Sequence, residues 1–252
     1  MLLFSLYPTA GTVYEHCCRA LDRSMTQGTH GLPLMEDLGS GTLLDTTPFG
    51  LIHEPTIQES VTAGVDIITA SGDKLLGGPQ VGLVLGKAHF IEKLKTQPLI
   101  RALRVDKTTL AALQATLLAY LEEKAVEEIP VWRMISVGTV SLARRARKWR
   151  ARLREAPELA ELRMEVRDSV SAVGGGSLPG QTLPTKVLAI SVDSAVALAA
   201  ALREPHNLLP VIARIEEEQL VIDPRTVLPE QDGTLVSALK NGLLATGSLN
   251  SR

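Results

Sequence analysis

The apolar positions in the first half of the chain form short continuous runs separated by polar, turn-rich stretches. The short runs predict strands at 32–37, 66–70 and 81–86. A helix is expected over 56–63, and Gly64 ends it because glycine readily adopts the left-handed C-cap conformation. Alternating strands and helices of this kind predict an α/β sheet, with ligands bound at the carboxyl ends of its strands.

Helical spacing dominates the next part of the chain. Leucines recur every three or four residues from Lys107 to Glu123, and Pro130 breaks this run. A further helix over 141–154 leads to a smaller α+β layer, for which we expect strands at 187–192, 211–215 and 220–222 and helices at 194–203 and after Pro229. The last residues, 247–252, are expected to form a frayed tail.

The composition is that of a globular protein: 45% of the 252 residues are hydrophobic, and the formal net charge is −2. The length allows one large or two ordinary domains, and the total charge gives no indication of nucleic-acid binding. No segment approaches the roughly 20 apolar residues of a membrane span, and the apolar start has no basic leader. Cys17 and Cys18 are adjacent and the five histidines are scattered, so neither set has metal-ligand spacing. We therefore expect a cytoplasmic protein without a metal or a membrane anchor.

The most informative segment runs from Ile67 to Gly82, where an apolar strand enters a glycine-flanked loop that presents Lys74. A lysine in such a loop can hold pyridoxal 5'-phosphate covalently if desolvation or neighbouring positive charge lets its amine lose a proton near neutral pH. Ser71, three residues earlier, can reach the cofactor phosphate from the same turn. The glycines allow a tight turn and close approach to a ligand. Without this context, the pattern would indicate an ordinary surface turn.

Asp37 lies 37 residues before Lys74, at the end of the first predicted strand. One strand-crossover-strand unit fits in that interval. In pyridoxal-phosphate enzymes an aspartate at a strand end pairs with the pyridine nitrogen and keeps it protonated, so that the ring accepts electrons. The ordinary alternative for Asp37 is an acid that caps the next helix.

Three segments match a known family in both wording and spacing: Glu36-Asp37-Leu38-Gly39-Ser40-Gly41, Ser71-Gly72-Asp73-Lys74-Leu75-Leu76-Gly77-Gly78-Pro79-Gln80 and Arg101-Ala102-Leu103-Arg104-Val105-Asp106-Lys107. Further matches lie at 127–130, 174–180 and 223–229. On these motifs the chain resembles the bacterial selenocysteine synthases, the L-seryl-tRNA(Sec) selenium transferases, from about Gly31 to Leu239.

The resemblance implies an aspartate-aminotransferase-like fold, the fold type I of pyridoxal-phosphate-dependent transferases. Residues 31–135 would be the C-terminal part of the large cofactor-binding domain, and 136–252 an interdomain helix and a small C-terminal domain. The implied reaction converts seryl-tRNA(Sec) to selenocysteinyl-tRNA(Sec) with selenophosphate, in a dimer-based homo-oligomer that is a decamer in the family. Lys74 would be the catalytic residue, with Asp37 and Ser71 as its partners in cofactor binding.

Arg101 and Arg104 would bind the anionic selenophosphate donor. They are three residues apart, so on a helical turn they would share a face and could hold one tetrahedral oxyanion between them. Solvated surface arginines are the ordinary alternative.

The position of these motifs in the chain departs from the family pattern. Family members are much longer than 252 residues, and their acidic strand lies well past the midpoint, whereas Asp37 lies near the start. Residues 1–30 are expected to be an atypical segment that does not match the family. We therefore expect a truncated or frame-shifted form, or the C-terminal half of a split gene, that is inactive by itself.

Two features leave alternatives open. Arg225 is either a core-edge arginine that pairs with Asp223 or Glu230, or a substrate contact. The basic run 144–154 is either an RNA-binding helix or, since Trp149 and Leu153 form an apolar stripe, an interdomain helix whose arginines face solvent. The second reading is favoured for that helix. Competing functions are a relative that uses the same lysine on a small amino acid, with Arg225 as the carboxylate clamp, and an inactive partner subunit.

Overall fold

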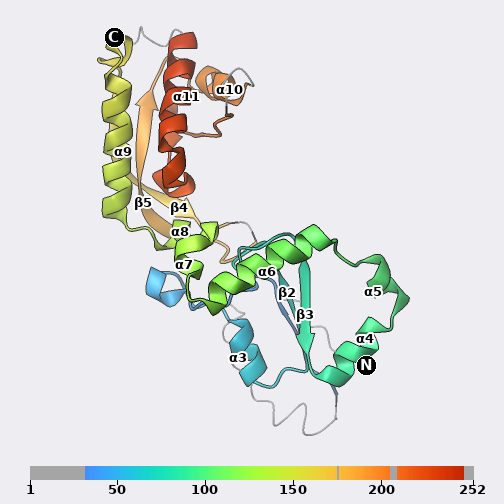
Figure 1. Ribbon diagram of the computed structural model, residues 1–252. Coiled ribbons are helices and arrows are strands. Elements are labelled where there is room, and N and C mark those ends of the chain that lie inside the picture. The colour runs from blue at the N-terminus through green and yellow to red at the C-terminus, as the bar shows by residue number, and fades with distance from the viewer. Residues whose placement is uncertain (1–31, 175, 205–208, 247–252) are drawn as a thin grey trace. The chain divides into compact units, whose positions relative to one another are not determined.

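The computed structural model describes residues 32–174, 176–204 and 209–246 (Figure 1). Their contacts divide them into two units. The first comprises residues up to 136 together with 172–181, and the second comprises 137–171 and the chain after 181. The connection 172–181 therefore belongs to the first unit, although the chain on both sides of it belongs to the second. The segments 1–30 and 247–252, with Cys17 and Cys18, lie outside the described residues.

A three-stranded sheet in the order β1-β2-β3 forms the centre of the first unit. β1 (Met35–Leu38) is parallel to β2 (Ile67–Ser71), whereas β3 (Gly82–Gly86) is antiparallel to β2. The register places Asp37 opposite Thr69. Because β1 and β2 are parallel, their carboxyl ends lie at the same edge of the sheet, and the loop that carries Lys74 leaves from that edge. The core of this unit contains Leu38, Ile57, Val65, Ile68 and Ala70.

The helix predicted over 56–63 is confirmed as α3 (Ile57–Thr62). It begins with a capping box, in which the Thr56 hydroxyl accepts a hydrogen bond from the Glu59 backbone N–H at 3.2 Å and the Glu59 carboxylate accepts one from the Thr56 N–H at 2.7 Å. Gly64 follows with a φ of +79°, as expected from its identity.

The other helices of the first unit follow β3. They are α4 (Ala88–Lys95), α5 (Pro98–Ala102), α6 (Lys107–Leu121), α7 (Ala125–Glu128) and α8 (Pro130–Ser136), and a short 3₁₀ turn, η1 (Thr47–Phe49), precedes α3. The long helix predicted from Lys107 is confirmed as α6, and the Asp106 carboxylate caps it by accepting from the Thr109 N–H at 2.8 Å. Pro130 both ends the preceding segment and begins α8, since proline is tolerated at the first helical position.

The second unit has a four-stranded sheet in the order β4-β5-β7-β6. Its strands are β4 (Met164–Ala172), β5 (Thr182–Ser191), β6 (Arg214–Glu216) and β7 (Gln219–Ile222). Its helices are α9 (Thr139–Arg154), α10 (Ala195–Arg203) and α11 (Asp232–Ala245), with 3₁₀ turns η2 (Pro157–Leu159), η3 (Pro224–Thr226) and η4 (Pro229–Gln231). Within this unit α9 packs against β5 and α11 (Figure 1).

The elements predicted for the second unit are confirmed, except that the strand expected at 211–215 is only Arg214–Glu216 and that β4 was omitted. β4 was not predicted because most of its side chains are polar and at least partly exposed, so the segment lacks a continuous apolar run. The core of the second unit contains Met164 of β4 together with Trp149, Leu153, Leu188, Ile190, Leu198 and Leu239. No helix in the described part of the chain is long and apolar enough to cross a membrane.

Candidate active site around Lys74

The loop that carries Lys74 is fixed by burial and by backbone hydrogen bonds. The two residues after the lysine, Leu75 and Leu76, are 1% and 0% exposed. The Leu75 N–H donates to the Ser40 carbonyl at 3.0 Å, which joins the lysine loop to the turn that follows β1. The Gly77 N–H donates to the Lys74 carbonyl at 3.0 Å and closes the loop. These hydrogen bonds and buried leucines fix the backbone of Lys74, whereas the lysine side chain is only half-buried.

Two aromatic residues that the sequence analysis did not single out also hold this loop. The Tyr120 hydroxyl donates to the Leu76 carbonyl at 2.9 Å and accepts from the Trp132 indole N–H at 2.7 Å. Burial raises the pKa of Tyr120 to about 12, and the hydrogen bond from Trp132 only partly opposes this shift. The hydroxyl therefore stays protonated and remains a donor. The sequence offered one indication of this role. Aromatic residues make up only 3% of the chain, and a buried Tyr or Trp usually forms a hydrogen bond through its polar group.

The Lys74 side chain lies against two glycines from distant parts of the chain. A Cβ atom at Gly39 would lie 3.6 Å from Lys74 Nζ, an ordinary contact distance. A Cβ at Gly176 would lie 2.8 Å from Lys74 Cε and 3.5 Å from Nζ, so any side chain there would displace the lysine. The motif at 174–180 was noticed in the sequence, but its position beside Lys74 was not foreseen.

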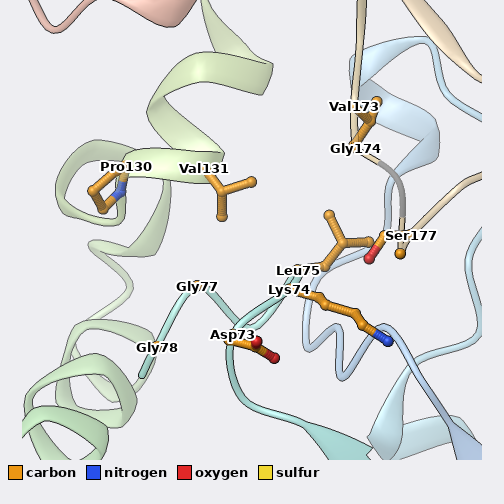
Figure 2. Close-up of a pocket in the computed structure, with 11 residues that line it drawn as sticks. Asp73, Lys74, Leu75, Gly77, Gly78, Pro130, Val131, Val173, Gly174 and Ser177 are labelled. Carbon is orange, nitrogen blue, oxygen red and sulfur yellow. The ribbon is translucent and has the colours of Figure 1, made fainter. Parts of the chain in front are cut away.

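A pocket of about 370 Å³ borders the same loop. It is lined by Asp73, Lys74, Leu75, Gly77, Gly78, Pro130, Val131, Val173, Gly174, Gly176 and Ser177. Figure 2 shows that the Lys74 side chain extends away from Pro130 and Val131, so the amine does not point toward that wall of the pocket. The amine lies instead beside Gly39 and Gly176.

Asp37 lies on the strand next to β2, and its side chain is exposed. The Thr69 hydroxyl donates to Asp37 Oδ1 at 2.8 Å. This bond orients the carboxylate at the carboxyl-terminal edge of the sheet. Thr69 was not predicted as a site residue. The sequence could have indicated it, because Thr69 lies two positions before Ser71 and so on the same face of the strand.

Hydroxyl groups around the lysine loop lack partners in the described chain. Ser71 is the last residue of β2, and its hydroxyl makes no hydrogen bond to another described residue. The hydroxyls of Ser40 and Ser177 are buried and also have no partner there. An unpaired buried hydroxyl costs on the order of 1–3 kcal/mol, and a bound ligand or ordered water that accepts or donates a hydrogen bond would offset this cost. An amine, a strand-end carboxylate and free hydroxyls fit a ligand that carries an aldehyde, a ring nitrogen and a phosphate.

Arg101 and Arg104 do not share a helical face. Arg101 is in the last turn of α5, which ends at Ala102, and Arg104 lies in the irregular segment between α5 and α6. The expectation of a common helical turn is therefore wrong, because the helix that begins at Pro98 is only five residues long. Both side chains are exposed, and neither forms an ion pair in the described part of the chain. No hydrogen bond or ion pair joins them to Lys74 or Asp37.

The family model described as SelA, L-seryl-tRNA selenium transferase, matches residues 14–228. The chain belongs to this family. The match begins at residue 14, so the expectation that all of 1–30 departs from the family is wrong for 14–30.

Curated relatives agree with this assignment. The L-seryl-tRNA(Sec) selenium transferase of Carboxydothermus hydrogenoformans is 48% identical over 203 residues, which are 80% of this chain and 43% of the relative. That of Nitratidesulfovibrio vulgaris is 46% identical, over 84% of this chain and 45% of the relative. The chain thus spans less than half the length of the curated relatives it matches.

The solved structure of D-glucosaminate-6-phosphate ammonia-lyase has the same fold, with a TM-score of 0.52 at 18% identity. The likeness covers 92% of this chain and 54% of that one. The predicted α/β, fold type I architecture is confirmed. Membership of the family supports the predicted cofactor, pyridoxal phosphate.

Arg225, left open in the sequence, is a structural residue of this SelA-family chain. It is 6% exposed, and its guanidinium donates to the carbonyls of Val137 at 3.1 Å and Pro184 at 2.6 Å. Burial lowers the pKa of Arg225, although the nearby Asp223 carboxylate opposes the shift. A guanidinium engaged in this way is not available to clamp a substrate carboxylate.

Proposed function

We propose that this chain carries the lysine-bearing half of an L-seryl-tRNA(Sec) selenium transferase. Such an enzyme converts seryl-tRNA(Sec) to selenocysteinyl-tRNA(Sec) with selenophosphate. One observation carries the proposal: the Lys74 amine lies between Gly39 and Gly176 at the edge of the sheet where β1 presents Asp37. Because the chain spans less than half of its relatives, the complete activity needs groups from the rest of such a protein.

Each site residue has a defined task in this proposal. Pyridoxal phosphate, when bound, supplies an electron sink for removal of the α-proton and the β-substituent of the seryl group. Lys74 would hold its aldehyde covalently, and its amine, once displaced by the amine of the substrate, would take the α-proton. Asp37, oriented by Thr69, keeps a proton on the ring nitrogen. Ser71 donates to the phosphate from the end of β2.

The donor site is assigned to Arg101 and Arg104. Both are exposed and free of ion pairs in the described chain, so each guanidinium is available to a phosphate-like anion. The carboxyl group of a seryl-tRNA is esterified, so this substrate needs no arginine clamp. The buried position of Arg225 supports this substrate class over a free amino acid.

A homo-oligomer in the cytoplasm is part of the proposal. Helix α5 and the turn that follows it expose neighbouring large apolar side chains: Leu99 (66%), Ile100 (40%) and Leu103 (68%). Apolar groups gathered in this way mark an interaction surface, and a second copy of the chain is the partner that the family resemblance implies.

Reductive trapping tests the proposal. The chain is mixed with pyridoxal phosphate, reduced with borohydride and digested, and the labelled peptide is mapped by mass spectrometry. We expect the label at Lys74 and its loss in Lys74→Ala, while Lys93→Ala, which removes an exposed lysine of α4, keeps it. A label on another lysine would contradict the assignment.

Turnover requires the remaining part of the protein. Fusing residues 32–246 to the N-terminal part of the Carboxydothermus hydrogenoformans relative provides it, and conversion of seryl-tRNA(Sec) with selenophosphate is then measured. Turnover that survives Lys74→Ala in this fusion would refute the proposed role of the lysine.

A further inference from the structure

Among the helices of the described residues, α9 has the most uneven charge distribution. Its 16 residues include seven basic and no acidic side chains. The chain as a whole has 26 basic and 28 acidic residues, so the sequence outside this helix has 19 basic and 28 acidic residues. A strongly basic element on an otherwise acidic chain concentrates positive potential on one surface.

The structure separates the seven basic residues into two groups. Arg145 is used internally: its guanidinium donates to the carbonyls of Pro224 and Val227, pairs with Asp232 and lies over the Trp149 ring. The other six lie outside the buried face, which contains Leu142, Ala143, Ala146, Trp149 and Leu153. Five are exposed and Arg150 is half-buried; the six are Arg144, Arg147, Lys148, Arg150, Arg152 and Arg154. We call these six residues the basic face.

The basic face destabilises the isolated helix. Arg144 and Lys148, Lys148 and Arg152, and Arg150 and Arg154 are like-charged pairs four residues apart, which repel. None of the six forms an ion pair within the part of the chain that the structure describes. A face adapted only to water would normally alternate charges and gain from such pairs. A polyanion bound along the helix would remove the repulsion.

We propose that the basic face of α9 binds the phosphate backbone of an RNA and, resting on the proposed function, that of the seryl-tRNA substrate. Five of its six side chains are arginines, whose planar guanidinium groups match phosphate oxygens. Arg144, Lys148 and Arg152 follow one another at intervals of about 6 Å along the helix axis, so each can contact a separate phosphate. The aromatic residue of the helix, Trp149, is buried, so no base stacks on this face and binding is independent of sequence.

The burial of Trp149 and Leu153 confirms the apolar stripe that favoured a solvent-facing interpretation of the arginines. That interpretation and RNA binding are compatible, because phosphate contacts require the side chains to be exposed.

Fluorescence anisotropy with an unacylated, labelled tRNA(Sec) transcript tests this face without any cofactor. The variant Arg144→Ala/Lys148→Ala/Arg152→Ala is compared with Arg163→Ala/Arg203→Ala/Lys240→Ala, which removes three exposed basic residues from elsewhere in the same unit. We expect the α9 variant to bind at least about 10-fold more weakly near 0.1 M salt, and the control to bind within about 2-fold of the parent chain. The slope of log K against log salt should fall by about 2, since each lost phosphate contact removes roughly 0.7–0.9.

Three outcomes would overturn the proposal. The first is that the parent chain does not bind the transcript at about 50 mM salt. The second is that both triple variants lose the same RNA affinity. The third is that the α9 variant, tested in parallel on vesicles of anionic phospholipid, loses vesicle binding but keeps its RNA affinity. Lys74→Ala separates this proposal from the proposed function, because it should bind the transcript like the parent chain. If reductive trapping at Lys74 fails while the α9 variant still loses RNA, the proposed function falls and the RNA-binding face stands.

Discussion

Two regions of the molecule use buried polar groups in opposite ways. In the second unit, the Asp223 carboxylate accepts from the Ser171 hydroxyl at 2.6 Å, the Thr185 hydroxyl at 2.9 Å and the Arg225 backbone N–H at 2.9 Å. We call these four residues the Asp223 cluster. Around Lys74 in the first unit, the buried hydroxyls of Ser40 and Ser177 have no such partners in the described chain. The oxygens of Asp223 are satisfied within the fold and stabilise it, whereas the Ser40 and Ser177 hydroxyls beside Lys74 can bind a ligand.

The largest effect is expected for Asp223→Ala. The change leaves two hydroxyls and a backbone N–H unpaired in a buried site, so it should destabilise the second unit by about 3 kcal/mol. Urea unfolding measures this loss, and Asp168→Ala, which breaks an exposed pair with Lys186, should cost less than about 1 kcal/mol. Lys74 should still be trapped by borohydride in both variants. An Asp223 variant as stable as the parent chain would remove the contrast between the two regions.

Arg101→Ala and Arg104→Ala should impair use of the donor and leave the fold unchanged. Each removes a charge-assisted contact worth about 1.4–2.8 kcal/mol, so the fused, active protein should use selenophosphate about 10- to 100-fold less well. The visible spectrum of the bound cofactor should not change. Lys93→Ala on α4 provides the control for loss of an exposed positive charge near α5. A variant that loses the cofactor would assign these arginines to cofactor binding instead.

Gly176→Ala should affect the lysine more than the fold. Its Cβ would meet the end of the flexible Lys74 side chain, which can move at small cost, so the free energy of unfolding should change by less than about 1 kcal/mol. The displaced amine should react with pyridoxal phosphate at least about 5-fold more slowly, as measured by borohydride trapping over time. Gly233→Ala, where a Cβ meets nothing within 4 Å, should react like the parent chain. Equal trapping rates in both variants would show that Gly176 does not position Lys74.

Glu59 provides the smallest effect and shows that the first unit also contains locally satisfied groups. Burial raises the pKa of its carboxyl, but hydrogen bonds from Thr56 and the nearby His53 outweigh burial and hold the pKa below its usual range. A depressed pKa stabilises the fold above the unfolded value of about 4.3, and this stabilisation is lost as the pH falls through the folded value. The parent chain should therefore exceed Glu59→Gln in stability by less than about 1 kcal/mol at pH 7, and the difference should shrink below about pH 4. A difference independent of pH would exclude the carboxylate as its source.

Local sequence was enough to predict the elements that build the sheet edge. The capping box at Thr56, the glycine at 64 and the apolar runs before Asp37 and Lys74 act within a few residues, so their structural effect does not depend on distant parts of the chain. The same locality explains why the motifs around Asp37 and Lys74 identified the family. The wrong expectation that Arg101 and Arg104 share a helical turn also has a local cause, because the helix that begins at Pro98 ends at Ala102, before Arg104.

Only the tertiary structure decided what surrounds these groups. It placed Gly176 against Lys74 and joined the lysine loop to α6 through the Tyr120 hydroxyl. It also buried Arg225, which donates to backbone carbonyls of the second unit. Arg225 and Arg101 are the same residue type, and no rule of sequence spacing predicts that one is buried and the other exposed. The physical reason is that burial and hydrogen-bond partners arise from segments far apart in the chain, and these surroundings determine whether a charged side chain stabilises the fold or remains free to bind a ligand.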